Sequence, residues 1–191
     1  MFMLKLICYE EFFVAIIILM KVFITAGSGV GKSSVVDELI KRGYTAYDAD
    51  NRDLHLTQLE IKETGEPVEW PKGYVDWSYY SWNANENRLK ELLETSDTVF
   101  VAGFLGNQEK LYHHFDKLIV LAIDPTEHER RLRTRPKREV SDDEQNIQRK
   151  IERYASRMEK FAEVATGFVI IDNTEPVKQT VNQILQIVNT P

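Results

Sequence analysis

This 191-residue chain has little cysteine, no long apolar run and no excess of positive charge. Its one cysteine, Cys8, excludes a disulfide framework and a cysteine-ligated metal cluster, and suits a reducing cytoplasm. The apolar run at residues 12–20 is shorter than the ~20 residues that a transmembrane helix needs, so we expect no membrane partner. The formal net charge of −6 argues against a general nucleic-acid-binding protein, which usually has a basic surface. No repeat, low-complexity segment or linker divides the chain, so we expect one main domain.

Residues 1–20 differ from the rest of the chain. Their apolar run lacks the small-x-small cleavage site of a signal peptide, and the pattern of a core strand begins directly after it at Val22. We interpret residues 1–20 as an N-terminal extension. It is either an extra strand or helix, or a sequence read from upstream of a natural start at Met3 or Met20. Residues 21–191 are the predicted domain, and the mass of protein from its native source would test this division.

A glycine-rich loop lies between an apolar strand pattern and a helical pattern, and the stretch from Val22 to Ser34 reads VFITAGSGVGKSS. This order is that of a P-loop, or Walker A motif. Glycine lets successive N–H groups converge on phosphate oxygens, and the helix that follows adds the positive end of its dipole. We expect these residues to bind the phosphates of a nucleoside triphosphate: Gly27, Ser28, Gly29, Val30, Gly31, Lys32, Ser33 and Ser34. The alternative is a plain turn between a strand and a helix. The first position of the strict motif is Ala26 rather than glycine.

Lys32 and Ser33 have specific roles in such a motif. Lys32 is expected at the β- and γ-phosphates, and the Ser33 hydroxyl on Mg²⁺. A Walker B strand would end in an acidic residue, but the strand predicted at residues 98–102 is followed by Gly103. The remaining magnesium ligands would then be waters, anchored by Asp48.

Asp48 and Asp50 follow a short strand predicted at residues 44–47. In an extended segment alternate residues face the same side, so both carboxylates are expected in one site at the carboxyl end of the strand, where open α/β sheets bind ligands. One would hold Mg²⁺ through water, and the other would orient or deprotonate an acceptor hydroxyl. The alternative for Asp50 is the N-cap of a helix.

All three tryptophans fall within residues 65–83, whose composition predicts a loop or a short helical cap. The segment is either an acceptor-binding lid whose rings stack on a planar or cyclic substrate, or an aromatic cluster that seals one edge of the sheet. After the strand at residues 98–102, Gly103 and Gly106 indicate close approach of a ligand, with Asn107 or Gln108 available for hydrogen bonds.

Six of the ten residues from Glu129 to Arg138 are basic. Concentrated positive charge stabilises a phosphoryl group in transfer, so we expect a lid at about residues 131–141 whose Arg135 or Arg138 closes over the transition state. A solvated basic face or an RNA-binding patch is the alternative. A long helix, capped by the sequence Ser-Asp-Asp-Glu at residues 141–144, should follow. Three basic residues lie off its apolar stripe and could face the lid: Arg149, Lys150 and Arg153.

Together these motifs resemble those of the nucleoside-monophosphate-kinase-like P-loop kinases, such as adenylate, shikimate and gluconate kinases, over about residues 21–189. The Asp48-Ala49-Asp50 motif resembles the Asp-x-Asp of shikimate kinases, whose first aspartate is associated with Mg²⁺ and the second with the acceptor hydroxyl. The run at residues 131–135 is similar to the start of the family's lid, which implies contact of Arg131 with ATP. The helix after it resembles the one that returns an arginine to the transferring phosphate, here Arg149 among its neighbours.

The resemblance has limits. Residues 102–104 read Ala-Gly-Phe where shikimate kinases have three glycines, so shikimate itself is not implied. The stretch at residues 65–70, GEPVEW, is similar to uncharacterised bacterial proteins described as nucleoside or nucleotide kinases.

The fold implied is a three-layer α/β P-loop NTPase fold, with a five-stranded parallel sheet flanked by helices, right-handed crossovers and a short lid. An acceptor-side insertion is expected at about residues 60–84. The predicted function is that of a cytoplasmic, ATP- and Mg²⁺-dependent kinase that phosphorylates a hydroxyl or phosphate of a nucleoside, nucleotide or similar metabolite. The alternative is a nucleotide-binding regulatory ATPase or switch without an acceptor. The missing Walker B carboxylate weighs against efficient hydrolysis, and the paired aspartates and arginine-rich lid favour transfer.

Overall fold

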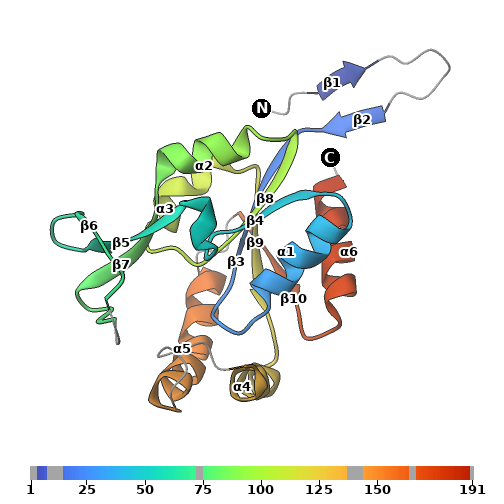
Figure 1. The fold of residues 1–191 in the computed structure, drawn as a ribbon. Helices are drawn as coiled ribbons and strands as arrows, with labels where there is room; N and C mark the ends of the chain where they lie inside the picture. Colours follow the sequence, from blue (N-terminus) through green and yellow to red (C-terminus); the bar gives the residue numbers. More distant parts are fainter. Residues whose placement is uncertain (1–3, 8–14, 72–74, 137–143, 164–166, 190–191) are drawn as a thin grey trace.

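The computed structural model describes residues 4–7, 15–71, 75–136, 144–163 and 167–189 (Figure 1). Its centre is a five-stranded sheet in the order β10-β9-β3-β8-β4, in which every neighbouring pair is parallel. The strands are β3 (Met20–Thr25), β4 (Thr45–Asp48), β8 (Thr98–Ala102), β9 (Lys117–Ala122) and β10 (Phe168–Asp172). The predicted five-stranded parallel sheet is confirmed.

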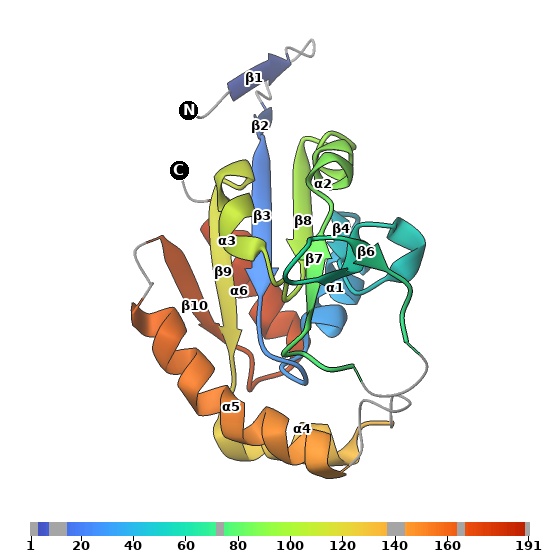
Figure 2. The ribbon, with the colours of Figure 1, turned by 90° about the vertical axis from the view of Figure 1, so that its left-hand side faces the viewer.

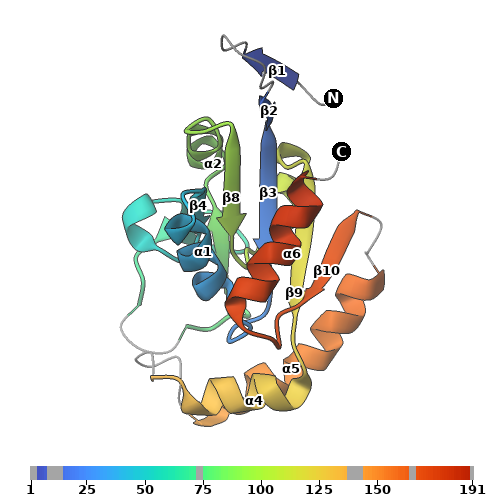
Figure 3. The same cartoon turned by 90° about the vertical axis from the view of Figure 1, so that its right-hand side faces the viewer.

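Helices cover both faces of this sheet, which gives the three predicted layers (Figures 2 and 3). One face is covered by α1 (Lys32–Lys41) and α6 (Val177–Asn189), the other by α2 (Glu86–Leu93) and α3 (Gln108–Leu111). Two further helices, α4 (Pro125–Thr134) and α5 (Glu144–Glu163), lie near the carboxyl ends of the strands. The segments between strands therefore enclose one end of the sheet.

Side chains of β3 alternate between the two faces of the sheet. Val22 and Ile24 belong to the buried cluster beneath α1 and α6, and Phe23 belongs to the cluster beneath α2. This alternation is the period of two that every strand has. All three side chains are at most 1% exposed. Because β3 is the central strand, the loop after it lies in the middle of the sheet edge.

Local signals explain where the helices begin and end. The Asp124 carboxylate caps α4 by accepting N–H groups of Thr126 at 2.8 Å and Glu127 at 3.2 Å. After α1 the chain turns at Gly43, whose φ of 87° favours glycine. Asn85 caps α2 through the Arg88 N–H at 3.0 Å.

A second, smaller sheet corrects the expectation of a loop or helical cap at residues 65–83. Its antiparallel strands are β5 (Thr57–Ile61), β6 (Pro67–Val68) and β7 (Tyr80–Ala84), in the order β6-β5-β7. Leu59 pairs with Trp82 and Ile61 with Tyr80. These partners are about twenty residues apart in the chain, so local composition does not reveal the pairing. The short 3₁₀ helix η1 (Arg52–Leu54) links β4 to this sheet.

The N-terminal segment forms a hairpin of β1 (Leu4–Ile7) and β2 (Ala15–Ile18). Among the described strands these two pair only with each other. Figure 1 shows the hairpin beyond the amino end of β3, away from the helical layers. Its assignment as an extension of the domain stays a prediction. In the described ranges, no helix has the length and apolarity required to cross a membrane.

Candidate functional site

A cavity of about 1910 Å³ lies at the carboxyl end of the parallel sheet. Each of the five strands is followed by a segment that lines it. In sheet order from one edge these include Asn173 after β10, Glu127 after β9, the glycine-rich loop after β3, Phe104 after β8 and Asp50 after β4. This is the position at which open parallel sheets bind ligands.

The glycine-rich loop has the backbone geometry of a phosphate-binding loop. Gly29 has a φ of 86° and Gly31 a φ of 111°, both in the region that favours glycine. Packing also requires glycine, because a Cβ on Gly29 would lie 2.6 Å from Leu132 Cδ2 and one on Gly31 would lie 2.6 Å from Asn173 Nδ2. Gly27, the third glycine predicted to supply special backbone angles, has no positive φ. Helix α1 begins directly after Gly31, so its free N–H groups face the loop.

Lys32 lies folded over the start of this loop. Its Nζ donates to Ala26 O at 3.0 Å and to Gly27 O at 3.4 Å, and the residue is only 8% exposed. Lys32 and Ser33 both line the cavity. Within the described residues the Ser33 hydroxyl makes no hydrogen bond. The Ser33 hydroxyl and the Asp50 carboxylate, in one cavity, offer the hard oxygen ligands that Mg²⁺ prefers, so these residues fit a magnesium ion.

Arg131 and Asn173 hold the loop in place. Both donate to Val30 O, Arg131 at 3.1 Å and Asn173 at 2.6 Å. The Arg131 guanidinium also donates to the carbonyls of Asn173 at 3.0 Å and Thr174 at 3.1 Å, and to Glu127 at 2.7 Å. Arg131 lines the cavity, as predicted for an ATP contact, but these N–H groups serve the protein itself. Contact of Arg131 with ATP stays a prediction, for which the flat face of the guanidinium is better suited than its edges.

His128 also supports the loop, and the sequence analysis did not identify it. Its Nε2 lies 2.8 Å from Ser28 O, and its ring lies against Tyr154 with centroids 4.2 Å apart. Since Ser28 O can only accept, Nε2 carries the proton. The side chain is 2% exposed, and burial lowers the pKa of His128 from its usual value. No sequence signal distinguishes this histidine from any other on an amphipathic helix.

The pH dependence of stability should reveal this buried histidine. Below about pH 6.5 the unfolded chain binds a proton at His128 that the native chain does not, so stability is fully present above that pH and falls as the pH decreases. The slope from this one group is at most about 1.4 kcal/mol per pH unit. Urea unfolding at pH 7.5 and 5.5 should show a smaller loss for His128→Gln, which keeps an N–H donor for Ser28 O. The exposed His113→Gln should match the wild type. If the free energy of unfolding fell equally between pH 7.5 and 5.5 in wild type and His128→Gln, His128 would not be the source of the pH dependence.

The structure separates the two aspartates. The strand ends at Asp48, and Asp48 Oδ1 accepts the Asp50 N–H at 3.0 Å across a turn, so the expected alternation of an extended segment does not continue. Asp50 is exposed and lines the cavity, but Asp48 is not among the lining residues. The N-cap of η1 is Asn51 rather than Asp50, because Asn51 Oδ1 accepts the Asp53 N–H at 3.1 Å. A magnesium role for Asp48 stays a prediction, and it would have to act through bridging water because Asp48 does not line the cavity.

The three tryptophans have features of both sequence-based alternatives, an aromatic cluster and a surface on which a substrate ring can stack. Trp70 packs edge-on against Trp77 and Trp82, with centroids 6.1 and 5.4 Å away, and the guanidinium of Arg52 lies 4.9 Å above its ring. All three rings line the cavity, and Trp70 and Trp77 remain 40% and 44% exposed. They therefore form a cluster that still presents flat faces to a ligand.

The glycines after β8 make room for neighbouring side chains, although Gly106 also lines the cavity, and the amides serve the protein itself. A Cβ on Gly103 would lie 2.8 Å from the Ala49 Cβ, and one on Gly106 would collide with Ser81 Oγ. The Asn107 side chain bonds both the N–H and the carbonyl of Ala84. Gln108 Oε1 accepts from Thr25 Oγ1 and Leu105 N, each at 3.3 Å. The expectation that Asn107 or Gln108 is available to a ligand is therefore wrong.

Helix α5 directs a row of basic residues to the cavity. Arg149, Lys150 and Arg153 all line it, as do Arg135 and a further arginine, Arg157. The sequence analysis missed Arg157, although the spacing of four from Arg149 through Arg153 places it on the same helix face. Arg138 and the predicted cap at residues 141–143 lie outside the described residues.

The cavity is basic although the chain is acidic. Its basic side chains outnumber its acidic ones. The basic lining residues are Lys32, Arg52, Lys62, Arg130, Arg131, Arg135, Arg149, Lys150, Arg153 and Arg157, and the acidic ones are Asp50, Asp76, Glu127 and Glu175. Hydrogen bonds from Arg130 and Arg131 lower the pKa of Glu127 to about 2, so this carboxylate is charged and already paired. With a net charge of −6 on the whole chain, such a concentration of cations indicates an anionic ligand.

A model of the AAA domain family matches residues 22–155, well over half of the chain. This chain belongs to that family. The match begins in β3 and extends into α5, so it covers the glycine-rich loop and most of the cavity. As a P-loop domain, the AAA domain is a nucleotide-binding unit. Among curated protein sequences, no significant match to this AAA domain was found.

Solved structures confirm the fold of this AAA domain. Shikimate kinase from Bacteroides thetaiotaomicron is similar with a TM-score of 0.53 at 16% identity, covering 90% of this chain and 99% of that one. A gluconokinase from Sinorhizobium meliloti 1021 has a TM-score of 0.51 at 17% identity, with 89% and 91% covered. Deoxyadenosine kinase from M. mycoides with bound dATP has a TM-score of 0.52 at 13% identity, with 90% and 100% covered. The predicted resemblance to small P-loop kinases is confirmed as one of fold.

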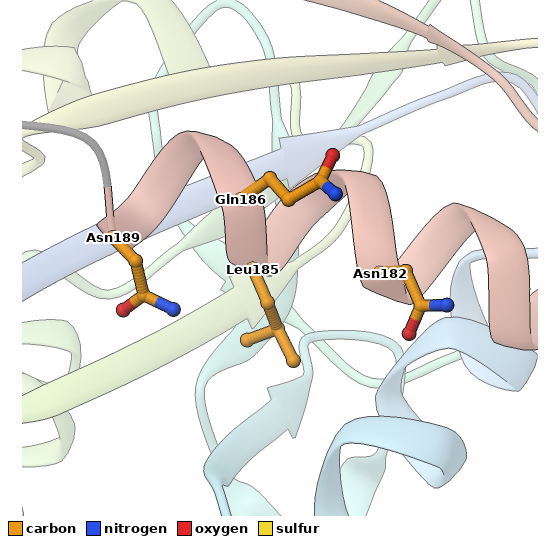
Figure 4. Close-up of a pocket in the computed structure, with 4 residues that line it drawn as sticks. All are labelled: Asn182, Leu185, Gln186 and Asn189. Atoms are coloured by element: carbon orange, nitrogen blue, oxygen red, sulfur yellow. The ribbon is translucent and has the colours of Figure 1, made fainter.

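A shallower depression of about 480 Å³ lies on the outer side of α6, far along the chain from the glycine-rich loop (Figure 4). Asn182, Leu185, Gln186 and Asn189 line it. It has no charged or nucleophilic side chain, so it offers no chemistry comparable with that of the large cavity.

Proposed function

We propose that this chain is an ATP- and Mg²⁺-dependent phosphotransferase that transfers the γ-phosphate to a hydroxyl or phosphate of a small acceptor, such as a nucleoside or nucleotide. One observation carries this proposal: the glycine-rich loop, Asp50, the aromatic cluster and the basic face of α5 line a single cavity. A switch that only binds nucleotide would not require an open aromatic surface next to the phosphate loop.

The donor side of the cavity has the groups that phosphate binding requires. In this proposal the N–H groups of the loop hold the phosphates, and Lys32 exchanges its carbonyl partners for phosphate oxygens. Mg²⁺, held by Ser33 and through water by Asp48, would offset charge on the phosphate oxygens. Arg131 contacts the nucleotide. Arg135, Arg138 and Arg149 stabilise the additional charge of the transferring group.

The acceptor side supplies a base. Transfer breaks the bond between the γ-phosphorus and the oxygen that bridges to the β-phosphate, and forms a bond from phosphorus to the acceptor oxygen. When the acceptor is a hydroxyl, its proton passes to the Asp50 carboxylate, which lines the cavity after β4. A lid at about residues 131–141 would exclude water, so that hydrolysis does not compete with transfer.

The direct test is release of ADP from ATP and Mg²⁺ in the presence of single acceptors. The panel contains nucleosides, nucleotides and small hydroxy acids, with phosphorylated acceptor identified by mass. We expect at least one acceptor to stimulate ADP release well above the rate with water. Tight ATP binding with no stimulation by any compound, and no phosphorylated product, would favour a regulatory nucleotide-binding domain instead.

A further inference from the structure

Three elements meet at the loop of residues 103–106 that follows β8. From β4, Ala49 N donates to Ala102 O at 2.8 Å, which places Asp50 beside this loop. From β7, the carbonyl of Trp82 accepts the Gly106 N–H at 2.7 Å. From α5, the guanidinium of Arg157 lies over the Phe104 ring, 4.5 Å from its centroid. The general base of the proposed reaction, an aromatic wall and an arginine therefore border one short loop.

Within the described ranges, Arg157 is half-buried without an ion pair, whereas the other cavity arginines of α5, Arg149 and Arg153, are exposed. Arg42, Arg88, Arg130, Arg131 and Arg133 each form an ion pair with a glutamate. In the part of the chain that the structure describes, no carboxylate pairs with Arg157, and the charge that acts on it is that of Arg153, which is also a cation. Burial of the half-buried side chain, together with Arg153, lowers the pKa of Arg157.

A guanidinium that is partly removed from water beside a second cation is unfavourable without a counter-charge. The side chain is held by packing on Phe104 and lines the same cavity as the glycine-rich loop. A planar guanidinium with unoccupied N–H groups matches phosphate and carboxylate oxygens in geometry. The missing counter-charge is thus best supplied by a ligand.

We propose that the acceptor is a flat-ring compound that already carries an anionic group, which Arg157 binds while the ring stacks on the tryptophan cluster of Trp70, Trp77 and Trp82. This rests on the proposed function and narrows its acceptor class. Nucleoside monophosphates fit it, and so do ring compounds with a carboxylate. Neutral nucleosides and sugars leave the cation without a partner and are poor acceptors.

Acceptors with and without the anionic group test this directly, and the carboxylate–ester pair isolates the anion because both members keep the same hydroxyl. The pairs are adenosine with AMP, uridine with UMP, and a hydroxylated ring carboxylate with its methyl ester. We expect kcat/KM to favour the anionic member by about 100-fold, since a site built for a polar group strongly rejects an analogue that lacks it. The pair with the larger ratio of kcat/KM, anionic over neutral member, shows whether the site prefers a phosphate or a carboxylate. Equal kcat/KM within each pair would overturn the inference while leaving the kinase in place.

Substitution of Arg157 separates acceptor binding from catalysis. Arg157→Met keeps an apolar stem for Phe104 and should raise KM for the anionic acceptor by tenfold or more, with kcat and the KM for ATP nearly unchanged. Arg157→Lys should have a KM for the anionic acceptor between those of the wild type and Arg157→Met, because lysine keeps the charge and lacks the planar fork of the guanidinium. Lys110→Met, an exposed change on α3 outside the cavity, is the matched control. A raised KM for ATP with an unchanged acceptor KM would assign Arg157 to the donor phosphates and overturn the inference.

Binding provides a readout that does not depend on turnover. All three tryptophans of the chain line the cavity, so their fluorescence reports occupancy. With the donor site saturated by ADP and Mg²⁺, AMP should quench this fluorescence at a lower concentration than adenosine, and Arg157→Met should abolish the difference. If the protein bound AMP more tightly than adenosine but transferred phosphate to no acceptor, the kinase proposal would fail and the anion site would stand. If AMP and adenosine bound equally well, the anion site would be refuted and the kinase proposal would stand.

Discussion

Replacement of Lys32 by methionine is expected to lower kcat for phosphoryl transfer by about 10²–10³-fold, the usual effect of removing one preorganised donor from a transition state. The ammonium lies at the mouth of the loop, 3.0 Å from Ala26 O, at the amino end of α1. It is 8% exposed, so water cannot substitute efficiently for its charge. Methionine preserves the length and apolar packing of the stem. Single-turnover phosphate transfer, with ATP binding measured in parallel, separates the chemical step from affinity.

Lys41→Met is the matched control for this change. Lys41 is an exposed residue in the last turn of the same helix and lies outside the cavity. Its substitution alters the net charge identically and should leave transfer unchanged. Thermal unfolding of both variants checks that the helix remains folded. A Lys32→Met enzyme that retains more than a tenth of the wild-type kcat would show that the phosphates bind elsewhere.

Asp50→Asn is expected to reduce kcat toward a hydroxyl acceptor by about 10²–10⁴-fold, the range for loss of a general base. Asp50 lines the cavity, and its amide is kept in position by Asp48 Oδ1 at 3.0 Å. Asp48→Asn retains an oxygen for that hydrogen bond and removes only the charge. We therefore expect Asp48→Asn to change the concentration of Mg²⁺ needed for half-maximal rate rather than the chemical step. Initial rates across a Mg²⁺ series measure both effects.

Asp53→Asn supplies the comparison for both aspartates, because Asp53, the second residue of η1, is exposed and does not line the cavity. It should behave as wild type. If Asp48→Asn abolished transfer and Asp50→Asn did not, the roles assigned here would be reversed. If neither variant changed the rate, the base would have to come from another part of the cavity.

Features that depend on contiguous residues were predictable from the sequence. The phosphate loop is one uninterrupted stretch between a strand and a helix, so its residue types and their order predict its conformation. The strands at residues 98–102 and 117–122 are short apolar runs whose burial follows from composition. The caps at Asp124 and Gly43 act within a few residues of their position. Family and fold followed from these local signals.

The arrangement of the site depended on residues that are distant in the chain. The β5–β7 pairing, the bond from His128 to Ser28 O, and the bonds from Arg131 to Val30 O and Asn173 O each join separate elements. Position along the chain cannot predict them, because only packing of α4 and β10 around the loop brings the partners together. Arg157 shows the same limit, since its helical spacing was visible but its contact with Phe104 was not.

The sequence by itself therefore determined that this is a P-loop α/β domain, because the phosphate-binding chemistry is built from consecutive residues. Only the tertiary structure decided which aspartate enters the cavity, that the tryptophans line it, and that the half-buried Arg157 has no carboxylate partner among the described residues. The physical reason is the parallel sheet. It gathers the carboxyl ends of five strands, separated by tens of residues along the chain, at one edge, and each contributes a different part of the site.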